Sequence, residues 1–296
     1  MFPGQGSQEI GMGNELLEKY SNLLKNTFEE SLGWSLESII NSDDPQLIKK
    51  TNIAQPYIFS ISYCYGIEAI NNLGNPAALI GHSLGEYTAL CLSGYLDFKD
   101  ALKVIAVRGE EMQKAVENSN TTMAAVLTND LNTTIEEINK LNNQGIQIWI
   151  SNYNDPSQIV ISSYIDDMNY LKSNPKAIGA KRVIPLEVAG AFHTEIVSPA
   201  KKPLHDVLNE IDISEGKIPV YMNVDAKKVD LSSIKENLVN QIDNSVLFSQ
   251  QIQNLNEDID PDLWCHIGPG NVTAGMVRKS ISYKDLKVIN SLESSS

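Results

Sequence analysis

The sequence of 296 residues predicts an α/β protein in which a large α/β domain carries a smaller inserted domain. Two observations lead to this prediction. Short apolar strands alternate with helical segments in both the first and the last third of the chain, a pattern typical of α/β folds. Between residues 121 and 187 the rhythm changes, and two strands follow each other directly. We therefore expect a large domain of residues 1–120 and 188–296, interrupted by a small domain of residues 121–187.

The first part of the large domain is predicted to place one strand among helices. Ala77–Ile80 is a short apolar run before a glycine, which predicts a buried parallel strand. A helix is expected before it, over Pro56–Asn72, because proline is favoured in the first helical turn. Two further helices are expected after it, over Leu84–Ser93 and Phe98–Met112.

The inserted segment has the order strand-helix-strand-strand-helix-strand. Its expected strands are Met123–Leu127, Ile146–Ser151, Gln158–Ser162 and Lys181–Leu186. Its expected helices are Leu131–Leu141 and Ile165–Leu171. The turn sequence Asn154-Asp155-Pro156 separates the two central strands. This order is the split arrangement of ferredoxin-like domains.

The second part of the large domain is predicted to return to the α/β pattern. The expected elements are a long helix over about Ile196–Ile211, a strand at Ile218–Asn223 and a helix near Leu231–Ile242. A last strand, Leu263–Ile267, leads through a Gly-Pro-Gly turn into a closing helix.

Composition is that of an ordinary globular protein, 42% hydrophobic and 20% charged. The chain lacks both the ~20-residue apolar stretch of a membrane span and the start of a secretory signal, so we expect a cytoplasmic protein with no membrane partner. Cys64, Cys91 and Cys265 lack the spacing of a disulfide framework or a zinc site, so no metal is expected.

The formal net charge of −14 argues against non-specific nucleic-acid binding, which needs a basic face. Two cation pairs, Lys181-Arg182 and Arg278-Lys279, interrupt this acidic background. They either attract anionic substrates locally or are solvated surface charges, and the sequence leaves both interpretations open.

The segment Gly81-His82-Ser83-Leu84-Gly85 fits the nucleophile-elbow pattern. The strand expected before it and the helix expected after it supply the tight turn that the pattern requires. Such a turn raises the serine hydroxyl above the sheet, and the amides at the start of the helix favour negative charge at the same point. We therefore expect an α/β-hydrolase-like large domain with Ser83 as a nucleophile.

A serine nucleophile needs a base, and the chain offers four histidines. His82 is expected to point away from the serine and to pack, His205 to lie on a helix surface, and His266 to be a hydrogen-bonded core residue. His193 follows Gly190-Ala191-Phe192 in a loop just after the inserted segment, where chain crossings create clefts. By elimination, His193 is the best candidate for the base.

Four motifs stand in order along nearly the whole chain. They are Phe2-Pro3-Gly4-Gln5-Gly6-Ser7-Gln8, Gly81-His82-Ser83-Leu84-Gly85-Glu86, Gly190-Ala191-Phe192-His193 and Ile267-Gly268-Pro269-Gly270. Together they resemble the malonyl-CoA:acyl carrier protein transacylase family, which includes the enzyme of bacterial fatty-acid synthesis and the acyltransferases of polyketide synthases. The resemblance implies that malonyl-CoA and an acyl carrier protein are the partners, and that a malonyl group moves to the phosphopantetheine thiol through an ester on Ser83. It implies no metal or redox cofactor, with the coenzyme A thioester as substrate.

The resemblance also implies a role for each matching residue. Ser83 would be the nucleophile and His193 the base, oriented by the main-chain carbonyl of Gln241. The backbone amides of Gln5 and Leu84 would form the oxyanion hole. Arg108 would bind the malonyl carboxylate through two hydrogen bonds, and Gln55 would line the site. Without the resemblance, a charge on a helix surface is the simpler interpretation of Arg108.

The Ala191-Phe192 pair is similar to the malonyl-selecting form of this loop. A bulky ring there would disfavour a methyl branch by about 1–3 kcal/mol, which is a preference rather than an exclusion. The Gly-Ala-Phe-His motif is more similar to free-standing acyltransferases that serve polyketide synthases in trans than to the fatty-acid enzyme. Two positions depart from the family. Only Met1 precedes the first motif, where a strand is usual, so either residues are omitted or the sheet edge is incomplete; Asn271 stands where lysine is common.

Two alternatives remain at this stage. The first is a thioester hydrolase that clears acyl groups from carrier proteins, which would gain nothing from a buried arginine. The second is a docking or scaffolding domain without activity, which is at odds with the intact set of Ser83, His193 and Arg108.

Overall fold

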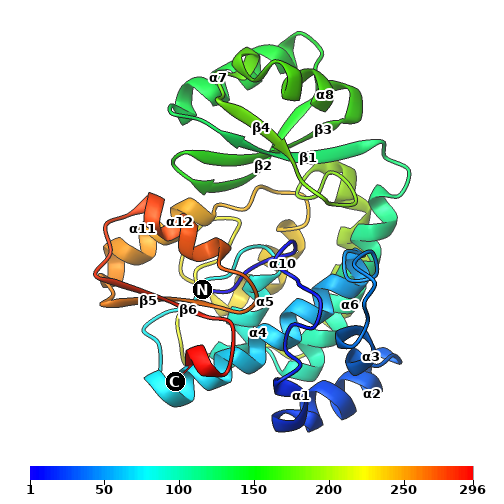
Figure 1. Cartoon of the computed structure of the whole chain (residues 1–296), viewed down its shortest axis with the longest axis vertical. Coiled ribbons are helices and arrows are strands. Elements are labelled where there is room, and N and C mark those ends of the chain that lie inside the picture. The colour runs from blue at the N-terminus through cyan, green and yellow to red at the C-terminus, as the bar shows by residue number, and fades with distance from the viewer. Residues whose placement is uncertain (296) are drawn as a thin grey trace.

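The computed structural model describes residues 1–295 and has a mixed α/β fold. Figure 1 shows a small sheet with helices on its outer side, above a larger part that contains both chain termini. The small sheet has a hydrophobic core of its own, centred on Ala124, Val126, Ile159 and Ile161. The larger part is built around a separate and more extensive core. Within residues 1–295, no helix is both long and apolar enough to cross a membrane.

The larger part is organised around short parallel segments. β5 (Leu263–Ile267) pairs in parallel with β6 (Asp285–Ile289). Next to β5 lies the start of the chain, since the Ile267 amide donates to the Met1 carbonyl at 2.8 Å. Single parallel bridges then join Phe2 to Gly81 and Leu79 to Val220.

Two expected strands are thus corrected by the structure. Residues 77–80 and 218–223 each form only one or two isolated bridges rather than a continuous ladder. The chain turns away after a few residues at both places, so too few backbone groups face each other for a longer ladder. Of the two alternatives for the start of the chain, the structure corrects the incomplete sheet edge. Met1 and Phe2 lie between β5 and residues 79–81, inside the sheet.

The helices of the larger part surround these segments. They are α1 (Leu16–Lys19), α2 (Phe28–Leu32), α3 (Leu36–Ile40), α4 (Thr51–Leu73), α5 (Gly85–Ser93), α6 (Phe98–Val116), α9 (Lys201–Asn209), α10 (Ile234–Asn240), α11 (Phe248–Ile259) and α12 (Val272–Ser280). Four of these helices, α1–α3 and α11, and the strand β6 are additional to the elements expected from the sequence. The expected helix of residues 196–211 is split, because a 3₁₀ turn over Glu195–Ala200 precedes α9. The helix expected near residues 231–242 likewise opens with a 3₁₀ turn before α10.

The start of α4 differs from its prediction. The helix begins at Thr51, and Pro56 lies inside it rather than in its first turn. Burial explains the difference. Thr51, Ala54 and Gln55 pack in the core, and this packing extends the helix to residues before the start that Pro56 indicated. α6 crosses this end closely. A Cβ at Gly109 would lie 3.0 Å from the Thr51 carbonyl oxygen.

The small sheet has four antiparallel strands in the order β2-β3-β1-β4. They are β1 (Thr121–Leu127), β2 (Ile148–Asp155), β3 (Gln158–Tyr164) and β4 (Arg182–Pro185). α7 (Leu131–Asn143) and α8 (Ile165–Ser173) cover its outer face (Figure 1). Each of the six elements expected here is present, with ends displaced by a few residues.

The other face of this sheet points toward the larger part. Main-chain hydrogen bonds fix the contact, because Tyr153 donates to the Val246 carbonyl and Val246 donates to the Ser151 carbonyl, both at 2.9 Å. β2 also packs on α11 and α12. The segment from β4 back to the larger part carries Phe192 and His193, which therefore enter the region between the two parts.

Candidate active site

Ser83 lies on a sharp turn between residues 79–81 and α5. Its φ is +50°, a left-handed conformation that non-glycine residues rarely adopt. The turn requires both flanking glycines. A Cβ at Gly81 would lie 1.9 Å from the Gly85 carbonyl carbon, and one at Gly85 would lie 2.4 Å from the Phe2 oxygen. The sequence motif therefore corresponds to a backbone geometry that other residues would not fit.

His193 approaches Ser83 from the segment that follows β4. Its Nε2 lies 2.8 Å from the Ser83 Oγ, and its Nδ1 lies 2.8 Å from the main-chain oxygen of Gln241. A carbonyl oxygen can only accept, so the Nδ1 carries the proton and the Nε2 is free to accept from the serine hydroxyl. His193 also has a left-handed backbone, with φ of +57°.

The imidazole of His193 is neutral over the physiological range. Burial, reinforced by the nearby cation Arg108, lowers the pKa of His193 to about 3. The hydrogen bond to the Gln241 carbonyl acts in the opposite direction but is outweighed. A neutral imidazole that accepts from a serine hydroxyl is the ground state that a general base needs.

Arg108 is buried beside the serine and is not a charge on a helix surface. Its side chain on α6 is 1% exposed. One terminal nitrogen donates to the Gln55 Oε1 at 2.7 Å, and the other donates to the Gln241 Oε1 at 2.8 Å and the Ser83 Oγ at 3.0 Å. Its Nε has no hydrogen-bond partner, and no carboxylate of residues 1–295 lies within ion-pair distance of the guanidinium. Burial lowers the pKa of Arg108 from its usual high value.

The backbone amides of Gln5 and Leu84 come from two different segments. Leu84 follows the serine on the turn, and Gln5 lies in the N-terminal loop that lines the cavity around Ser83. Neither backbone N–H donates a hydrogen bond to another residue in the part of the chain that the structure describes. The Ser83 N–H, in contrast, is already donated to the Asn223 Oδ1 at 2.8 Å. Two unpartnered amides beside a nucleophile are what an oxyanion hole requires.

Three buried polar residues below the serine were not predicted as site residues. Glu86, Asn223 and Gln251 are all fully buried. Asn223 accepts from the Ser83 amide and donates to the Gly81 carbonyl at 2.7 Å, so that it holds both sides of the turn. Glu86 accepts from the Asn223 amide at 2.6 Å, and its burial raises its pKa to about 8. Two signals were available: Glu86 ends the motif Gly81–Glu86, and Asn223 is a polar residue at the carboxyl end of an expected parallel strand.

The remaining histidines lie away from the Ser83 hydroxyl. His266 is buried and bonds through Nδ1 to the Thr273 Oγ1 at 2.6 Å, as expected of a core histidine. His205 is exposed on α9, also as expected. His82 packs against the Phe248 ring and bonds to the Asn154 Oδ1 at 2.9 Å, so it joins the small sheet to the turn as well as packing.

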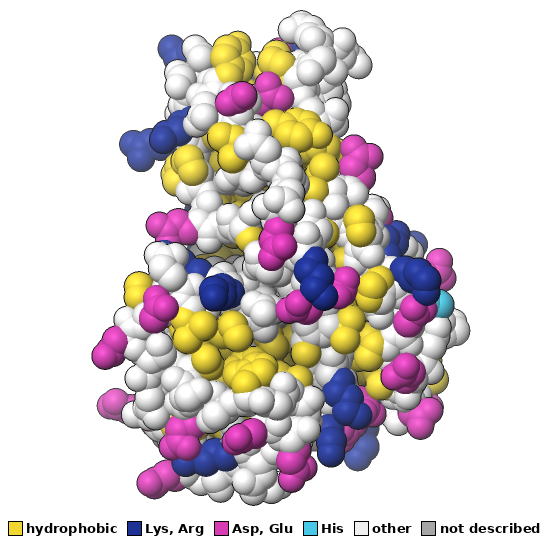
Figure 2. Space-filling model, turned by 90° about the vertical axis from the view of Figure 1, so that its right-hand side faces the viewer, with side chains coloured by type: hydrophobic (Ala, Val, Ile, Leu, Met, Phe, Trp, Pro, Cys, Tyr) yellow, Lys and Arg dark blue, Asp and Glu magenta, His cyan; other side chains and the backbone are white. Residues whose placement is uncertain are grey.

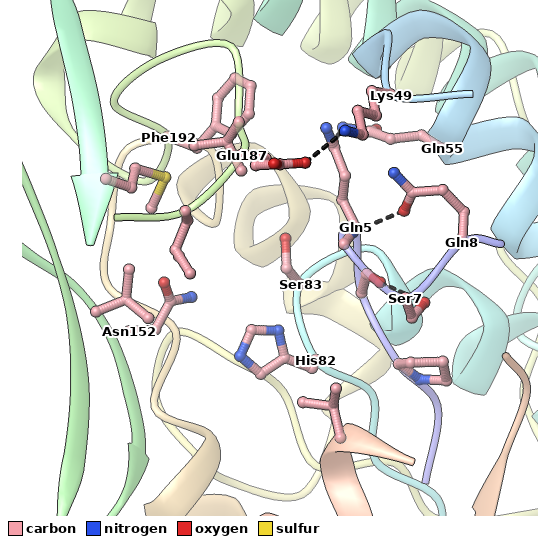
Figure 3. Close-up of a pocket in the computed structure, with 18 of the residues that line it drawn as sticks. Gln5, Ser7, Gln8, Lys49, Gln55, His82, Ser83, Asn152, Glu187 and Phe192 are labelled. Carbon is pink, nitrogen blue, oxygen red and sulfur yellow. Dashed lines mark hydrogen bonds and ion pairs between the residues drawn. The ribbon is translucent and has the colours of Figure 1, made fainter. Parts of the chain in front are cut away.

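These residues share a cavity of about 740 Å³ between the small sheet and the larger part. In Figure 3 the Ser83 side chain points into the middle of this cavity, between Gln5 and Gln55 on one side and Asn152 and Phe192 on the other. The Phe192 ring is 6% exposed and forms part of the wall. Thus every candidate site residue of the sequence analysis except Leu84 and Gln241 lines the cavity, and those two contact Ser83 and His193 directly.

Cations are scarce around this cavity. Among its lining residues only Arg108 and Lys49 are cationic, apart from histidines, and Lys49 forms an ion pair with Glu187 across one side (Figure 3). Neither Lys181-Arg182 nor Arg278-Lys279 lines it, and Lys279 lies 3.4 Å from Asp155. Figure 2 shows acidic and basic side chains interspersed over one face, and the basic side chains there do not gather into one large patch. No group of three or more potential ligand side chains within residues 1–295 could hold a metal ion.

Comparison with known protein families matches residues 1–292 to the acyl transferase domain. The chain belongs to this family. It is 38% identical over 283 residues to the malonyl CoA-acyl carrier protein transacylase of Bacillus subtilis, covering 94% of this chain and 89% of that protein. The Staphylococcus aureus transacylase of the same name is 32% identical over 296 residues, covering 99% and 95%.

Solved structures agree with this assignment. The malonyl CoA-acyl carrier protein transacylase of Clostridium perfringens is 32% identical and superposes with a TM-score of 0.89, over 99% of this chain and 93% of that one. A malonyl-transacylase solved in complex with its type II polyketide synthase acyl carrier protein is 29% identical, with a TM-score of 0.90 over 99% and 96%. The resemblance expected from the four motifs is therefore confirmed, and the mixed α/β fold matches that of these enzymes.

Proposed function

We propose that the protein is an [acyl-carrier-protein] S-malonyltransferase, which moves a malonyl group from malonyl-CoA to the phosphopantetheine thiol of an acyl carrier protein. The single observation that carries this proposal is Arg108. Its buried guanidinium donates hydrogen bonds to neutral oxygens, among them the Ser83 hydroxyl at 3.0 Å, and lies 5.5 Å from the centre of the Tyr87 ring. With no carboxylate of the described residues in ion-pair distance, a buried charge of this kind is unfavourable unless a substrate anion joins it. The malonyl group supplies a carboxylate one methylene away from its thioester carbon.

The first half-reaction forms an ester on Ser83. His193 Nε2 takes the hydroxyl proton as the Ser83 Oγ forms a bond to the thioester carbon. The C–S bond then breaks, and the sulfur of coenzyme A receives the proton from His193. The Nδ1–H bond to the Gln241 carbonyl keeps the imidazole oriented and stabilises it while it is protonated.

The second half-reaction transfers the acyl group. The thiol of the carrier's phosphopantetheine arm gives its proton to His193, and its sulfur attacks the ester carbon. The C–O bond to Ser83 breaks, and the serine oxygen recovers the proton. In both steps the amides of Gln5 and Leu84 would stabilise the oxyanion, a contribution of about 3–4 kcal/mol for a single well-placed donor.

The remaining candidate residues would set substrate choice. Arg108 would bind the malonyl carboxylate, with Gln55 and Gln241 holding the guanidinium. Phe192 would limit the space for a methyl branch on the acyl chain, because its ring is packed into the cavity wall. The expected outcome is a preference of about 1–3 kcal/mol for malonyl over methylmalonyl.

We also propose the arrangement that would place these residues. Residues 1–120 and 188–296 would form an α/β-hydrolase-like domain, and residues 121–187 a ferredoxin-like domain inserted into it. The strand order β2-β3-β1-β4 and the separate hydrophobic cores support this division. The three free cysteines are compatible with a reducing compartment, and we propose that the protein is cytoplasmic. We also propose that its product is used in fatty-acid or polyketide synthesis.

The test of this function uses the purified protein, malonyl-CoA and an acyl carrier protein with its phosphopantetheine arm. Mass spectrometry of the carrier follows its gain of a malonyl group, and chromatography follows free malonate. Accumulation of malonyl-carrier protein supports the transferase. Accumulation of malonate without malonyl-carrier protein would instead identify a hydrolase.

A further inference from the structure

Gln241 has a side chain with contacts that are independent of its main-chain carbonyl. The carbonyl accepts from the His193 Nδ1, whereas the side-chain Oε1 accepts from the Arg108 terminal nitrogen at 2.8 Å. The residue is fully buried at the end of α10. One residue thus contacts the candidate base through its backbone and the candidate carboxylate-binding arginine through its side chain.

The amide of Gln241 has only one favourable orientation. Its Nε2 faces two oxygens that can only accept, the Ser83 carbonyl at 2.9 Å and the Asn223 Oδ1 at 3.3 Å, and it also contacts a carboxyl oxygen of Glu86. Turning the amide over would place its oxygen against these two acceptors and its NH₂ group against the guanidinium. The acceptors below the serine therefore fix the oxygen of Gln241 toward Arg108.

A glutamine at position 241 leaves the Arg108 guanidinium with its positive charge, whereas a glutamate there would not. A carboxylate 2.8 Å from the guanidinium would neutralise it and compete with a substrate anion. The Gln241 oxygen, like the Gln55 oxygen on the other terminal nitrogen, orients the guanidinium without cancelling its charge. The cation thus stays available for a carboxylate, and its two terminal nitrogens stay in a defined plane.

We propose that the Gln241 side chain is a specificity-determining positioning residue, which sets the preference for malonyl over uncharged acyl groups by holding Arg108. This inference rests on the proposed function, because it requires Arg108 to bind the malonyl carboxylate. The inference concerns the side chain of Gln241 and not its main-chain carbonyl, which orients His193. A substitution at position 241 changes the side chain and keeps that carbonyl.

The test compares Ser83 acylation by malonyl-CoA and acetyl-CoA in Gln241→Met, which keeps the length of the side chain and removes its hydrogen bonds. The ratio of the two kcat/KM values should fall at least about tenfold, because the guanidinium loses one of the two glutamine oxygens that anchor it. The KM for malonyl-CoA should rise. Gln55→Met removes the other glutamine oxygen and should also lower the ratio. This variant tests the same inference if Gln241→Met does not fold.

Two comparisons separate this role from a structural one. In an Arg108→Ala background, Gln241→Met should change the ratio by less than about twofold, because the two residues act as one unit. Gln251→Met is the matched control. Gln251 is equally buried and belongs to the same network, but its contacts are Asn223 and the Tyr221 carbonyl rather than Arg108. It should lower thermal stability and leave the ratio within about twofold.

The inference is overturned if both Gln241→Met and Gln55→Met keep the wild-type ratio, or if Gln251→Met lowers it equally. An undiminished effect of Gln241→Met in the Arg108→Ala background would overturn it as well. If the wild-type protein itself shows no preference for malonyl, the proposed function fails together with this inference. A preference in the wild type that survives these substitutions removes only the role of Gln241.

Discussion

Replacing Arg108 by alanine is expected to switch the substrate ratio rather than simply lower activity. The guanidinium is buried, lies 3.0 Å from the Ser83 Oγ and has no carboxylate partner in residues 1–295. A malonyl carboxylate bound by two charge-assisted hydrogen bonds would gain about 1.5–3 kcal/mol from each. Losing both costs about 3–6 kcal/mol, which corresponds to a decrease of about 10²–10⁴-fold in kcat/KM for malonyl-CoA.

Acetyl-CoA should respond in the opposite way. An acetyl group has no carboxylate for Arg108 to bind, and the alanine variant removes a hydrogen-bond donor that now contacts the nucleophile. We expect acetyl transfer to hold or to rise. Arg108→Lys keeps the charge but loses the planar, two-pronged geometry, so it should restore only part of the malonyl preference.

The assay measures initial rates of Ser83 acylation with malonyl-CoA and acetyl-CoA at equal concentrations. Arg182→Ala is the control, because Arg182 is exposed on β4 and does not line the cavity. It should leave the ratio unchanged. Circular dichroism confirms that each variant is folded. An unchanged malonyl-to-acetyl ratio in a folded Arg108→Ala protein would show that Arg108 does not bind the carboxylate, and full preference in Arg108→Lys would show that charge alone suffices.

Three further predictions follow from the geometry of the site. His193→Ala should slow acylation by about 10²–10⁴-fold, as measured in a single turnover, while His266→Ala should not match that loss in a folded protein. Since burial lowers the pKa of His193 from 6.5 to about 3, the unfolded chain takes up a proton at this residue that the folded chain does not, and stability falls as the pH drops below 6.5. Between pH 7 and pH 5 the wild type should therefore lose about 2 kcal/mol more unfolding free energy than His193→Gln in urea titrations; equal losses would contradict a buried neutral imidazole. Gly81→Ala should destabilise the fold by about 3 kcal/mol or more, since its Cβ would meet the Gly85 carbonyl carbon at 1.9 Å, whereas Gly275→Ala, with open space around its Cβ, should be tolerated.

Most of the small sheet and of the turn at Ser83 could be predicted from the sequence. Short apolar runs and the turn residues Asn154-Asp155-Pro156 mark β1, β2 and β3, so their order and type could be predicted. The Gly81–Gly85 motif requires both of its glycines, because Gly81 lies against the Gly85 main chain and Gly85 lies against the Phe2 main chain. Short sequence patterns of this kind predict the local backbone structure.

The elements that depend on distant contacts could not be predicted in this way. The parallel segments at residues 79–81 and 219–221 are held by single bridges, and no local pattern distinguishes one bridge from a full ladder. From the sequence alone, Arg108 is indistinguishable from an arginine on a helix surface. Its burial depends on α4 and on Gln241, which lies 133 residues further along the chain. The roles of Glu86 and Asn223 in holding the turn arise only when the chain brings them below Ser83.

We propose that transfer proceeds through a malonyl ester on Ser83, and intact-protein mass spectrometry can detect that ester. Incubation with malonyl-CoA should add the mass of one malonyl group to the wild-type protein and none to Ser83→Ala. Addition of acyl carrier protein should then remove that mass from the wild type and transfer it to the carrier. A malonyl adduct of equal yield on Ser83→Ala would contradict the account, because another residue would then be the nucleophile.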